Sequence, residues 1–587
     1  MSAQETAVAT RGGGFLLAET DPAQVFTPER LSDEHRMAAR TMREFLDREV
    51  LPQVAALEGK DWDLTRRLIR QLGELGFLGA EVPAAYGGLE LDKITALVLT
   101  EAIGPASSFA VSASAHTGIG TLPIVFFGNE EQKRRYLPRL ATGELLGAYA
   151  LTEPTAGSDA MSIRTTATRS GDVFLLSGTK QFITNAAFAD LFVVFAKVDG
   201  EHHTAFLVDR DTPGLVIGSE EHKLGIKGSS TASLLLEQAR VPVGNLLGEV
   251  GQGFKIAVNI LNMGRFKLAA GCLGAAKGAL REALAYARDR KQFNRALVEF
   301  GLIKQKLAQM VARIYAAESM VYRTGGLVEG TLGGSHADSK AVMSALEEYA
   351  VECSINKVFA SEVLDFVVDE AVQIFGGYGY IEEYPAARAY RDARINRLFE
   401  GTNEINRLLI TGMLLRRAQR GQLPLIDAAK AAADEMLTPA ASGDGQYAGT
   451  LSAERQQVAA AKKAALFAAG VALQKHVAGI EEQQEILAWL ADMVSEIFAV
   501  ESAVLRAVQA SPGEEALPAL LARAYVQEAL PRLEGAARQA LAASADGENL
   551  RTVLAGLRRL LRYTPVNTVA LHRAIADRTA NAERYPL

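Results

Sequence analysis

The spacing of apolar residues changes twice along this chain, and this change restricts the possible folds more than any other feature. From about Ser32 to residue 147 the apolar residues recur at helical spacing. Between about 148 and 247 they form short runs about 8 to 12 residues apart, with turn residues between them: VFLLSG, QFITNA, LFVVFAKV, TAFLVD, GLVIGS and SLLLEQARV. Helical spacing returns at about Gly253 and continues to the C-terminus. We therefore expect helices on both sides of a small antiparallel sheet or barrel.

The length of 587 residues is too great for one hydrophobic core, so several domains are expected. A small, polar stretch, GDGQYAGTLSAE, marks a boundary near 443–454, and amphipathic segments follow it. The pattern predicts the following division: a loose N-terminus at 1–25, a helical domain at 26–147, a β domain at 148–252, a helical bundle at 253–420 and a helical extension at 421–587.

Charge and cysteine content exclude several classes of function. The net charge of −7 argues against a nucleic-acid-binding protein, which would carry a basic patch. The chain has two cysteines, Cys272 and Cys353, both in apolar, helix-like sequence, which fits a reducing compartment and no disulfide framework. No C-x-x-C or H-x-x-x-H pattern suggests zinc, so we expect no metal site.

Targeting segments are not expected either. The first twenty residues lack the cationic start and apolar core of a signal peptide, and they contain few arginines. The apolar run LFVVFAKV is far shorter than the roughly 20 residues of a membrane span. We expect a cytoplasmic protein. The segment 423–437 is amphipathic but acidic, which leaves membrane contact open but disfavoured.

Two stretches in the β segment could bind a planar or polar ligand. AYALTEPTAGSDA (148–160) offers the hydroxyls of Thr152 and Ser158, although composition alone favours a turn without a ligand. In KQFITNAAFAD (180–190), Phe182 and Thr184 are two apart and share one face of a strand. That face could cover a ring, or Phe182 could simply be a core aromatic beside a surface threonine.

The glycine-rich and basic stretches of the helical part do not match a dinucleotide-binding fingerprint. AVQIFGGYGY (371–380) follows a helix rather than a strand, and GEVGQGF (248–254) lies outside any βαβ unit. A helix C-cap and a strand-to-helix loop are their simplest explanations. In RDRKQFNRAL (288–297), Arg290 could clamp a phosphate, or the cluster could be a solvated run of charges.

The stretch LFEGTNEINR (398–407) holds two glutamates with different explanations. Thr402 or Asn403 can cap the helix that follows, and Glu404 then lies in its first turn, where a carboxylate is favoured. Glu400, between an apolar dipeptide and Gly401, is not needed by that helix. Partial burial would raise its pKa toward the range of a general base.

Taken together and in order, these stretches resemble the acyl-CoA dehydrogenase flavoenzymes. The resemblance covers about residues 30–415, and it is carried by YALTEPTAGSDA, KQFITNAAFAD, LGIKGSSTASLLLEQARVPVGNLLGEVGQGFKIAV, RKQFN, AVQIFGGYGY and RLFEGTNEINR. ILNMGRF, FGLIKQKLAQM and the long C-terminal extension are most similar to the very-long-chain branch. The resemblance implies a mainly α fold: an N-terminal helical domain, a middle β-barrel-like domain and a C-terminal four-helix bundle, here followed by an extra helical domain.

The resemblance also implies chemistry. It implies FAD, an acyl-CoA substrate and its conversion to trans-2-enoyl-CoA in fatty-acid β-oxidation, with Glu400 as the α-proton base and hydride transfer to flavin N5. The thioester carbonyl oxygen would be held by a backbone N–H at the base and by a ribityl hydroxyl, an oxyanion-hole arrangement. Electron-transfer flavoprotein is the implied electron acceptor, and a homo-oligomer, expected to be a dimer, is the implied assembly.

By match of motif, the resemblance assigns further contacts. Those to the cofactor are Tyr149, Leu151, Thr152, Ser158, Phe182, Ile183, Thr184, Arg290, Gln292, Phe293, Gln373, Gly376, Gly377, Thr402, Asn403 and Glu404. Those to the substrate are Ser158, Asn262, Arg265 and Gly401. Residues 290–293 often reach the cofactor across a subunit interface. The family often has Trp where Phe182 stands; Phe keeps the stacking face without the indole N–H.

Two questions stay open at this stage. Small residues at 112–115 (Ser-Ala-Ser-Ala) leave room for a long acyl tail, or they allow close packing of helices. An oxidase of the same fold, or a flavin-bearing assembly or binding protein, remains an alternative to the dehydrogenase. An intact Glu400 argues against a pure binding protein, which needs no base.

Overall fold

The structure, a computed structural model, describes residues 11–437, 447–477, 479–510 and 513–587. Ser32 caps the first helix of the N-terminal domain, because its hydroxyl accepts a hydrogen bond from the His35 backbone N–H at 3.2 Å. Farther along, one π-helical turn at His116–Gly120 interrupts the helical stretch. The helices of this domain are α2 (Asp33–Phe45), α3 (Val54–Glu58), α4 (Trp62–Glu74), α5 (Lys93–Ile103), α6 (Ser108–Ala115), α7 (Leu122–Phe127) and α8 (Glu130–Ala141).

The β domain is one eight-stranded sheet with the order β6-β7-β3-β2-β4-β5-β8, and β1 pairs with β4. Its strands are β1 (Gly147–Ala150), β2 (Thr166–Ser170), β3 (Val173–Thr184), β4 (Leu191–Val198), β5 (His202–Asp209), β6 (Leu215–Glu220), β7 (Thr231–Pro242) and β8 (Leu246–Leu247). The sheet is mixed rather than purely antiparallel, since β1 and β2 both run parallel to β4. The runs VFLLSG and QFITNA belong to one strand, β3, of 12 residues.

Long helices form the centre of the molecule. Two of them meet at Tyr349, and a small hairpin follows the longest helix that the structure describes. The elements are α9 (Gly253–Asp289), β9 (Lys291–Gln292), β10 (Arg295–Ala296), α10 (Gly301–Leu332), α11 (Ser339–Glu348), α12 (Ala350–Phe375), α13 (Pro385–Ala393) and α14 (Asn403–Gln419). Their facing sides are almost completely buried, and they position the segments on which the candidate site is built.

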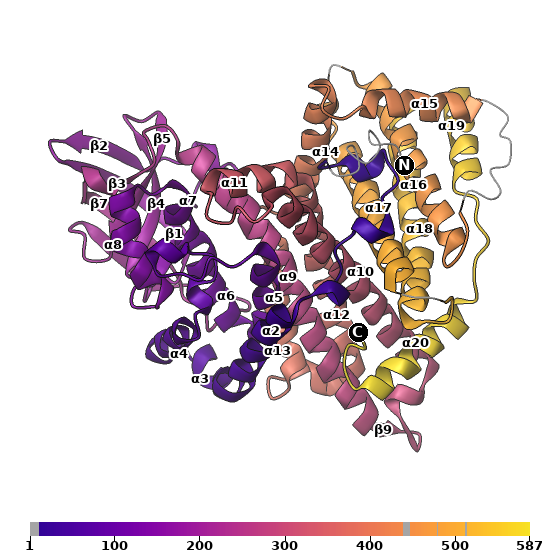
Figure 1. Ribbon diagram of the computed structural model, residues 1–587, viewed down its shortest axis with the longest axis horizontal. Helices are drawn as coiled ribbons and strands as arrows, with labels where there is room; N and C mark the ends of the chain where they lie inside the picture. The colour runs from indigo at the N-terminus through magenta and orange to yellow at the C-terminus, as the bar shows by residue number, and fades with distance from the viewer. Residues whose placement is uncertain (1–10, 438–446, 478, 511–512) are drawn as a thin grey trace.

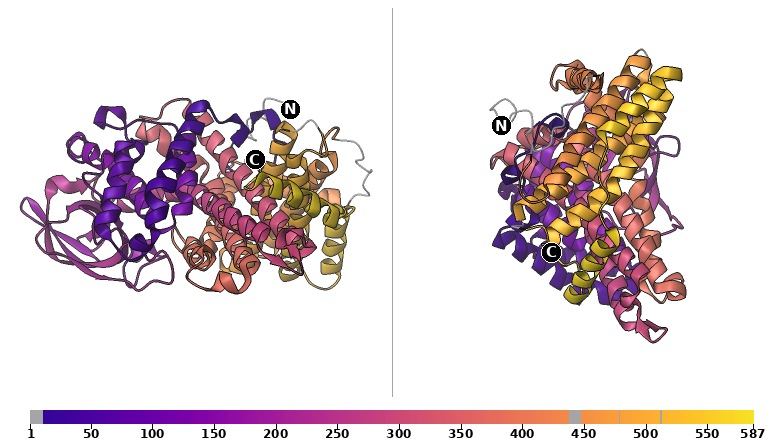
Figure 2. Two further views of the ribbon diagram at one scale, coloured as in Figure 1. Left: turned by 90° about the horizontal axis from the view of Figure 1, so that it is seen from below. Right: turned by 90° about the vertical axis from the view of Figure 1, so that its right-hand side faces the viewer.

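The extension packs on the side of this bundle that faces away from the sheet (Figure 1). Its helices are α15 (Leu425–Leu437), α16 (Ser452–Lys475), α17 (Gln484–Ala510), α18 (Leu517–Ser544), α19 (Gly547–Leu560) and α20 (Thr568–Ala582). Figure 2 shows its long helices running side by side. Buried ion pairs join it to α10: Arg506 bonds Glu318 at 2.6 Å and Arg323 bonds Glu501 at 2.9 Å.

The expectation of a loose segment at 1–25 needs correction for the part that the structure describes; residues 1–10 lie outside the described residues. Residues 11–25 cross the bundle and reach the extension, where the Phe15 ring packs 4.8 Å from that of Phe498. The backbone N–H of Gly13 donates to Glu352 Oε1 at 2.7 Å. Composition did not reveal this, because the partners lie more than three hundred residues away along the chain.

One segment among the described residues is long and apolar enough to be considered as a membrane span. It covers Ser108–Phe127 and is mostly buried inside the protein. The core helix of a globular protein can have the same length and hydropathy. The segment packs here as an inner element of the N-terminal helical domain, against the sheet and α9.

Candidate active site

Glu400 lies in the short loop that joins Arg394–Arg397 to α14, and its backbone is strained. Its φ is +56°, a left-handed conformation that side-chain-bearing residues rarely adopt, and the φ of Gly401 is +77°. The Arg265 guanidinium of α9 donates to the Glu400 carbonyl oxygen at 3.2 Å. The Lys357 ammonium of α12 donates to the Gly401 carbonyl oxygen at 2.7 Å. Two helices, α9 and α12, therefore hold the loop in a conformation that it would not adopt by itself.

The Glu400 carboxylate lies directly against α9. A Cβ atom built on Gly264 would lie 2.4 Å from Glu400 Oε2, so only glycine leaves room there. Burial raises the pKa of Glu400 to about 7, although the charges of Arg265 and Lys357 act in the opposite direction. Oε2 is buried and has no hydrogen-bond partner in the described part of the chain. The group thus has the protonation behaviour of a base that works near neutral pH.

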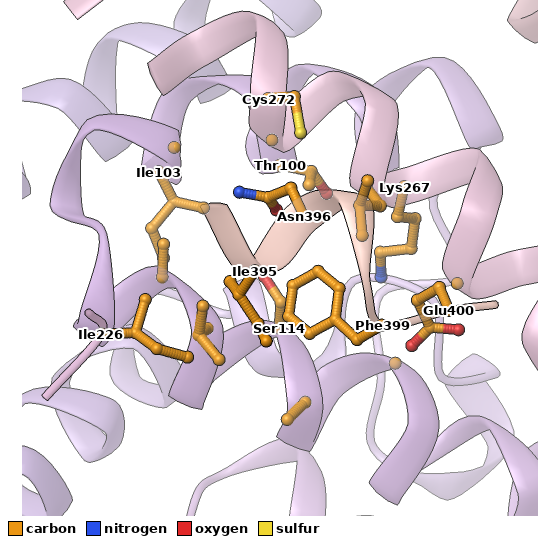
Figure 3. Close-up of a pocket in the computed structure, with 18 of the residues that line it drawn as sticks. Thr100, Ile103, Ser114, Ile226, Lys267, Cys272, Ile395, Asn396, Phe399 and Glu400 are labelled. Atoms are coloured by element: carbon orange, nitrogen blue, oxygen red, sulfur yellow. The ribbon is translucent and has the colours of Figure 1, made fainter. Parts of the chain in front are cut away.

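A largely apolar cavity of about 190 Å³ extends from Glu400 between α5, α6, α9 and the segment 389–400. Figure 3 shows Glu400 and Lys267 on one side of it and Ile103 and Ile226 on the other, with Phe399 and Ile395 between them. Ser114 and Ala115, two of the small residues in the 112–115 stretch, line the cavity. A narrow apolar cavity with a carboxylate at one end is suited to an alkyl chain whose reactive end meets a base.

The sheet places three of the predicted cofactor residues near this carboxylate. Thr184, at the end of β3, lines the same cavity as Glu400. The Tyr149 hydroxyl of β1 is buried without a partner, and burial, together with the Glu400 charge, raises its pKa well above the usual range. Phe182 is 60% exposed beside them, which is unusual for a phenylalanine in a strand and leaves a flat apolar surface free.

Other predicted residues around this end of the sheet differ in how their side chains are used. Ile183 is buried in the core of the sheet, so only its backbone can reach a ligand on the Phe182 side. The Asn403 side chain accepts from Lys357 at 2.8 Å and donates to Ser361 and Glu362, so it too is committed to the protein. Of the remaining members, Asn262 and Arg265 are buried, Leu151 is buried, Thr152, Gly401 and Thr402 are half-buried, and Ser158 and Glu404 are exposed.

A second group of predicted cofactor residues lies elsewhere in the molecule. Arg290, Gln292 and Phe293 belong to the β9 end of α9, and the Arg290 guanidinium lies 5.7 Å from the centre of the Tyr378 ring. Gln373, Gly376, Gly377 and the hairpin residues are exposed, with Phe293 at 88%. Figure 1 shows β9 projecting from the far end of the bundle, well away from β3. One chain therefore does not bring the two groups together.

Sequence reasoning missed several residues that shape the site. Gly264 and Lys357 act on Glu400 and its loop from two other helices, and Lys267 and Asn396 line the cavity. A signal existed for two of them: Lys267 and Lys357 each directly precede apolar residues in a helical stretch, LAAGCL and VFA, which is typical of a buried and paired side chain. Nothing local distinguishes Gly264 from other helical glycines.

The residues at this site fit a flat cofactor placed against Phe182. At this edge of the β domain, the exposed ring of Phe182 lies two residues before Thr184, whose half-buried side chain lines the cavity together with Glu400, and the buried oxygens of Tyr149 and Glu400 have no partner in the described part of the chain. Partnerless buried oxygens are costly unless a ligand satisfies them. This edge also opens onto the cavity that ends at Glu400.

Comparisons with known proteins agree with this architecture. Four family models match: acyl-CoA dehydrogenase N-terminal domain (residues 32–144), middle domain (148–239), and two C-terminal domains (251–415 and 460–559). A probable acyl-CoA dehydrogenase of Bacillus subtilis is 49% identical over 595 residues, covering 99% of this chain and 100% of the relative. Human mitochondrial short-chain specific acyl-CoA dehydrogenase is 39% identical over 67% of this chain and 92% of the relative.

Among solved structures, the crystal structure of an acyl-CoA dehydrogenase complexed with FAD from Bacillus anthracis superposes with a TM-score of 0.95. It is 48% identical and covers 98% of this chain and 100% of that one. The fold and site therefore define an oxidoreductase of the helical–β–helical type. The chain belongs to the acyl-CoA dehydrogenase family, among the members that carry an additional C-terminal domain.

Proposed function

We propose that this protein is an FAD-dependent enzyme that dehydrogenates long-chain acyl-CoA thioesters to trans-2-enoyl-CoA, as in fatty-acid β-oxidation, with Glu400 as the base. The observation that carries the proposal is the buried Glu400 carboxylate, whose pKa is raised to about 7, at the end of an apolar cavity. Family membership supports FAD and an acyl-CoA substrate.

Glu400 removes the α-proton of the thioester. The carboxylate is held against α9 by the space that Gly264 leaves, and Arg265 and Lys357 keep enough of it ionised near neutral pH. In the described structure, the hydrogen bonds that hold the loop do not use the backbone N–H of Glu400. This N–H is therefore free to donate to the thioester carbonyl oxygen. The apolar cavity keeps water away from the developing negative charge.

The cofactor is proposed to lie against Phe182 and Thr184, close to Tyr149, with Thr402 and Glu404 toward its phosphates. The chemistry that FAD supplies when bound is acceptance of the β-hydride at N5. Arg290, Gln292, Phe293, Gln373, Gly376 and Gly377 are exposed at the far end of the same chain. We propose that they complete the cofactor site of a second copy, which makes the active species a homodimer.

The preference for long chains and the placement in the very-long-chain branch rest on two features. Ser114 and Ala115 leave the cavity open beside α6, where larger side chains would fill it. The extension is matched by a family model of its own at 460–559, whereas the short-chain relative aligns with 67% of the chain. The same proposal includes the domain limits given above, electron-transfer flavoprotein as the electron acceptor and a cytoplasmic location. The two buried free thiols are consistent with a reducing compartment.

Anaerobic bleaching of the FAD-loaded enzyme by acyl-CoA thioesters of increasing chain length tests the proposal. We expect loss of the oxidised flavin absorbance with long saturated chains, and reoxidation by electron-transfer flavoprotein rather than by oxygen. A sharp optimum at short chains would overturn the chain-length part. Rapid oxygen consumption would favour an oxidase, and absence of bleaching with every thioester would favour a binding protein.

A further inference from the structure

A second cavity lies next to the cavity that ends at Glu400. It has a volume of about 40 Å³ and is lined mainly by apolar side chains of α2, α4, α5 and α6, including Met42, Leu72 and Leu99. Thr100, Ile103, Ser114 and Lys267 line both cavities. These four side chains therefore form a thin partition between the acyl-binding cavity and the interior of the N-terminal helical domain.

Lys267 is the only charged member of this partition, and a buried carboxylate holds its ammonium group. Lys267 Nζ lies 2.6 Å from Glu81 Oε2, while Lys93 Nζ lies 2.9 Å from Glu81 Oε1. All three side chains are nearly or fully enclosed, with exposed fractions of 11%, 5% and 3% for Lys267, Glu81 and Lys93. Lys93 lines neither cavity.

Glu81 is ionised and therefore holds the Lys267 ammonium group in place. Burial alone would raise the pKa of its carboxyl group, but the charges of Lys267 and Lys93 outweigh it and lower the pKa to about 2. Glu81 is thus ionised at any physiological pH. Its two oxygens fix the two ammonium groups, and the four-carbon stem of Lys267 is left to form the cavity wall.

We propose that Lys267, held by Glu81, is a specificity-determining residue that closes the wall of the acyl-binding cavity toward the second cavity and so prevents a long acyl tail from extending into it. This inference rests on the proposed function insofar as the cavity at Glu400 holds an acyl tail. The physical reason is that a methylene chain that displaced the ammonium would separate it from Glu81, leaving the Lys267 charge buried and unpaired and Glu81 with one cation fewer. Without that ammonium, the partition consists of small or apolar side chains.

A receptor for a carboxylate at the far end of the acyl chain is the competing use of a lysine here. The geometry favours the closing role, because Lys267 already bonds a carboxylate of the protein within the partition. A second carboxylate would have to enter beside Glu81, and like charges at that distance repel each other.

The test is binding of S-alkyl-CoA thioethers of increasing chain length to the FAD-loaded enzyme, measured by calorimetry. Thioethers cannot be dehydrogenated in the proposed way, so this readout does not depend on catalysis, and failure of the inference is distinguishable from failure of the proposed function. For Lys267→Met we expect the longest ligands to bind about tenfold more tightly than to wild type, near the gain from burying two further methylenes. Binding of short ligands should not change.

Lys93→Met is the matched control, because Lys93 bonds the same carboxylate from outside both cavities. It should leave the chain-length profile unchanged, and Lys267→Arg, which keeps the charge, should not extend it. Lys267→Gln serves as a second opening variant if Lys267→Met does not fold. An unchanged profile in the opening variants would overturn the proposal. The proposal would also be overturned if the wild-type enzyme bound an ω-carboxyalkyl-CoA more tightly than the S-alkyl-CoA of equal length, and if Lys267→Met lost this difference.

Discussion

At the scale of single residues, Glu400 combines a strained backbone with a buried, partnerless carboxylate oxygen. We predict that Glu400→Gln slows flavin reduction by acyl-CoA about 10³-fold, since removal of a general base typically costs 10²–10⁴. Gln keeps the shape of the side chain but cannot accept the α-proton. Stopped-flow bleaching measures the effect, and the FAD content of the variant serves as the control. Bleaching at near wild-type rate with normal FAD content would assign the base elsewhere.

The same residue predicts a pH dependence. Burial raises the pKa of Glu400 to about 7, so below pH 7 the carboxyl group holds its proton and cannot accept another. We therefore expect kcat/KM for acyl-CoA, which reports the free enzyme, to rise with pH through about 7 and then level off. In Arg265→Lys, a charge remains near Glu400 but the hydrogen bond from Nε to its carbonyl oxygen is altered. The midpoint of the kcat/KM profile of Arg265→Lys should lie within about one pH unit of the wild-type midpoint. A wild-type kcat/KM that does not change between pH 5 and 9 would contradict the prediction.

At the scale of elements, the packing of α9 against the Glu400 loop depends on one glycine. We predict that Gly264→Ala slows flavin reduction about 10²-fold, because its Cβ would lie 2.4 Å from Glu400 Oε2 and would displace the base by a fraction of an ångström or more. Gly330→Ala is the matched control, since Gly330 lies within α10 and a Cβ there would meet nothing within 4 Å. Equal rates for the two variants would show that the carboxylate moves without cost.

The start of α14 gives a prediction about stability rather than about the rate of flavin reduction. The Thr402 hydroxyl caps the helix by accepting from the Ile405 backbone N–H at 3.2 Å, and Glu404 lies exposed in the first turn. Thr402→Ala should lower the free energy of unfolding by about 1 kcal/mol. Glu404→Gln should lower it by about 0.3–1 kcal/mol or weaken FAD retention, with little effect on the bleaching rate. Loss of bleaching in FAD-loaded Glu404→Gln would contradict the separation of the two glutamates.

The elements also show what the sequence could reveal and what it could not. Glu400 stood out because the start of α14 explains Glu404 but does not explain Glu400. The resemblance to a known family then supplied a role for Glu400. The clearance at Gly264 and the anchoring by Lys357 were not accessible, because they depend on how α9 and α12 pack against the loop. Likewise, strand content followed from periodicity, whereas the parallel pairing of β1 with β4 is a long-range choice of register.

At the scale of the whole molecule, the position of the extension determines whether the second group of predicted cofactor residues, near β9, stays exposed. The far end of the bundle, with β9, remains exposed, whereas the extension covers another side of α10. Polar bonds fix its position: Tyr585 near the C-terminus donates to Glu318 of α10 at 2.7 Å, and Thr27 of the N-terminal segment donates to Gln509 of α17 at 3.0 Å. The extension is therefore an integral part of the fold, and it leaves the proposed dimer surface free.

This contact gives the last prediction. Arg506 of α17 is 1% exposed, bonds Glu318 of α10 at 2.6 Å and Glu29 at 2.7 Å, and lies 4.5 Å from the centre of the Tyr315 ring. Arg506→Ala should cost about 3–5 kcal/mol, because the Glu318 carboxylate stays buried with one positive charge fewer. Hydrogen exchange of the amides in α17 measures this as a lower opening free energy, while the β domain keeps its protection. Arg551→Ala, in an ion pair on α19 that is 81% exposed, should change exchange by less than about 0.5 kcal/mol. Equal effects of the two substitutions would show that the extension is held by its apolar contacts alone.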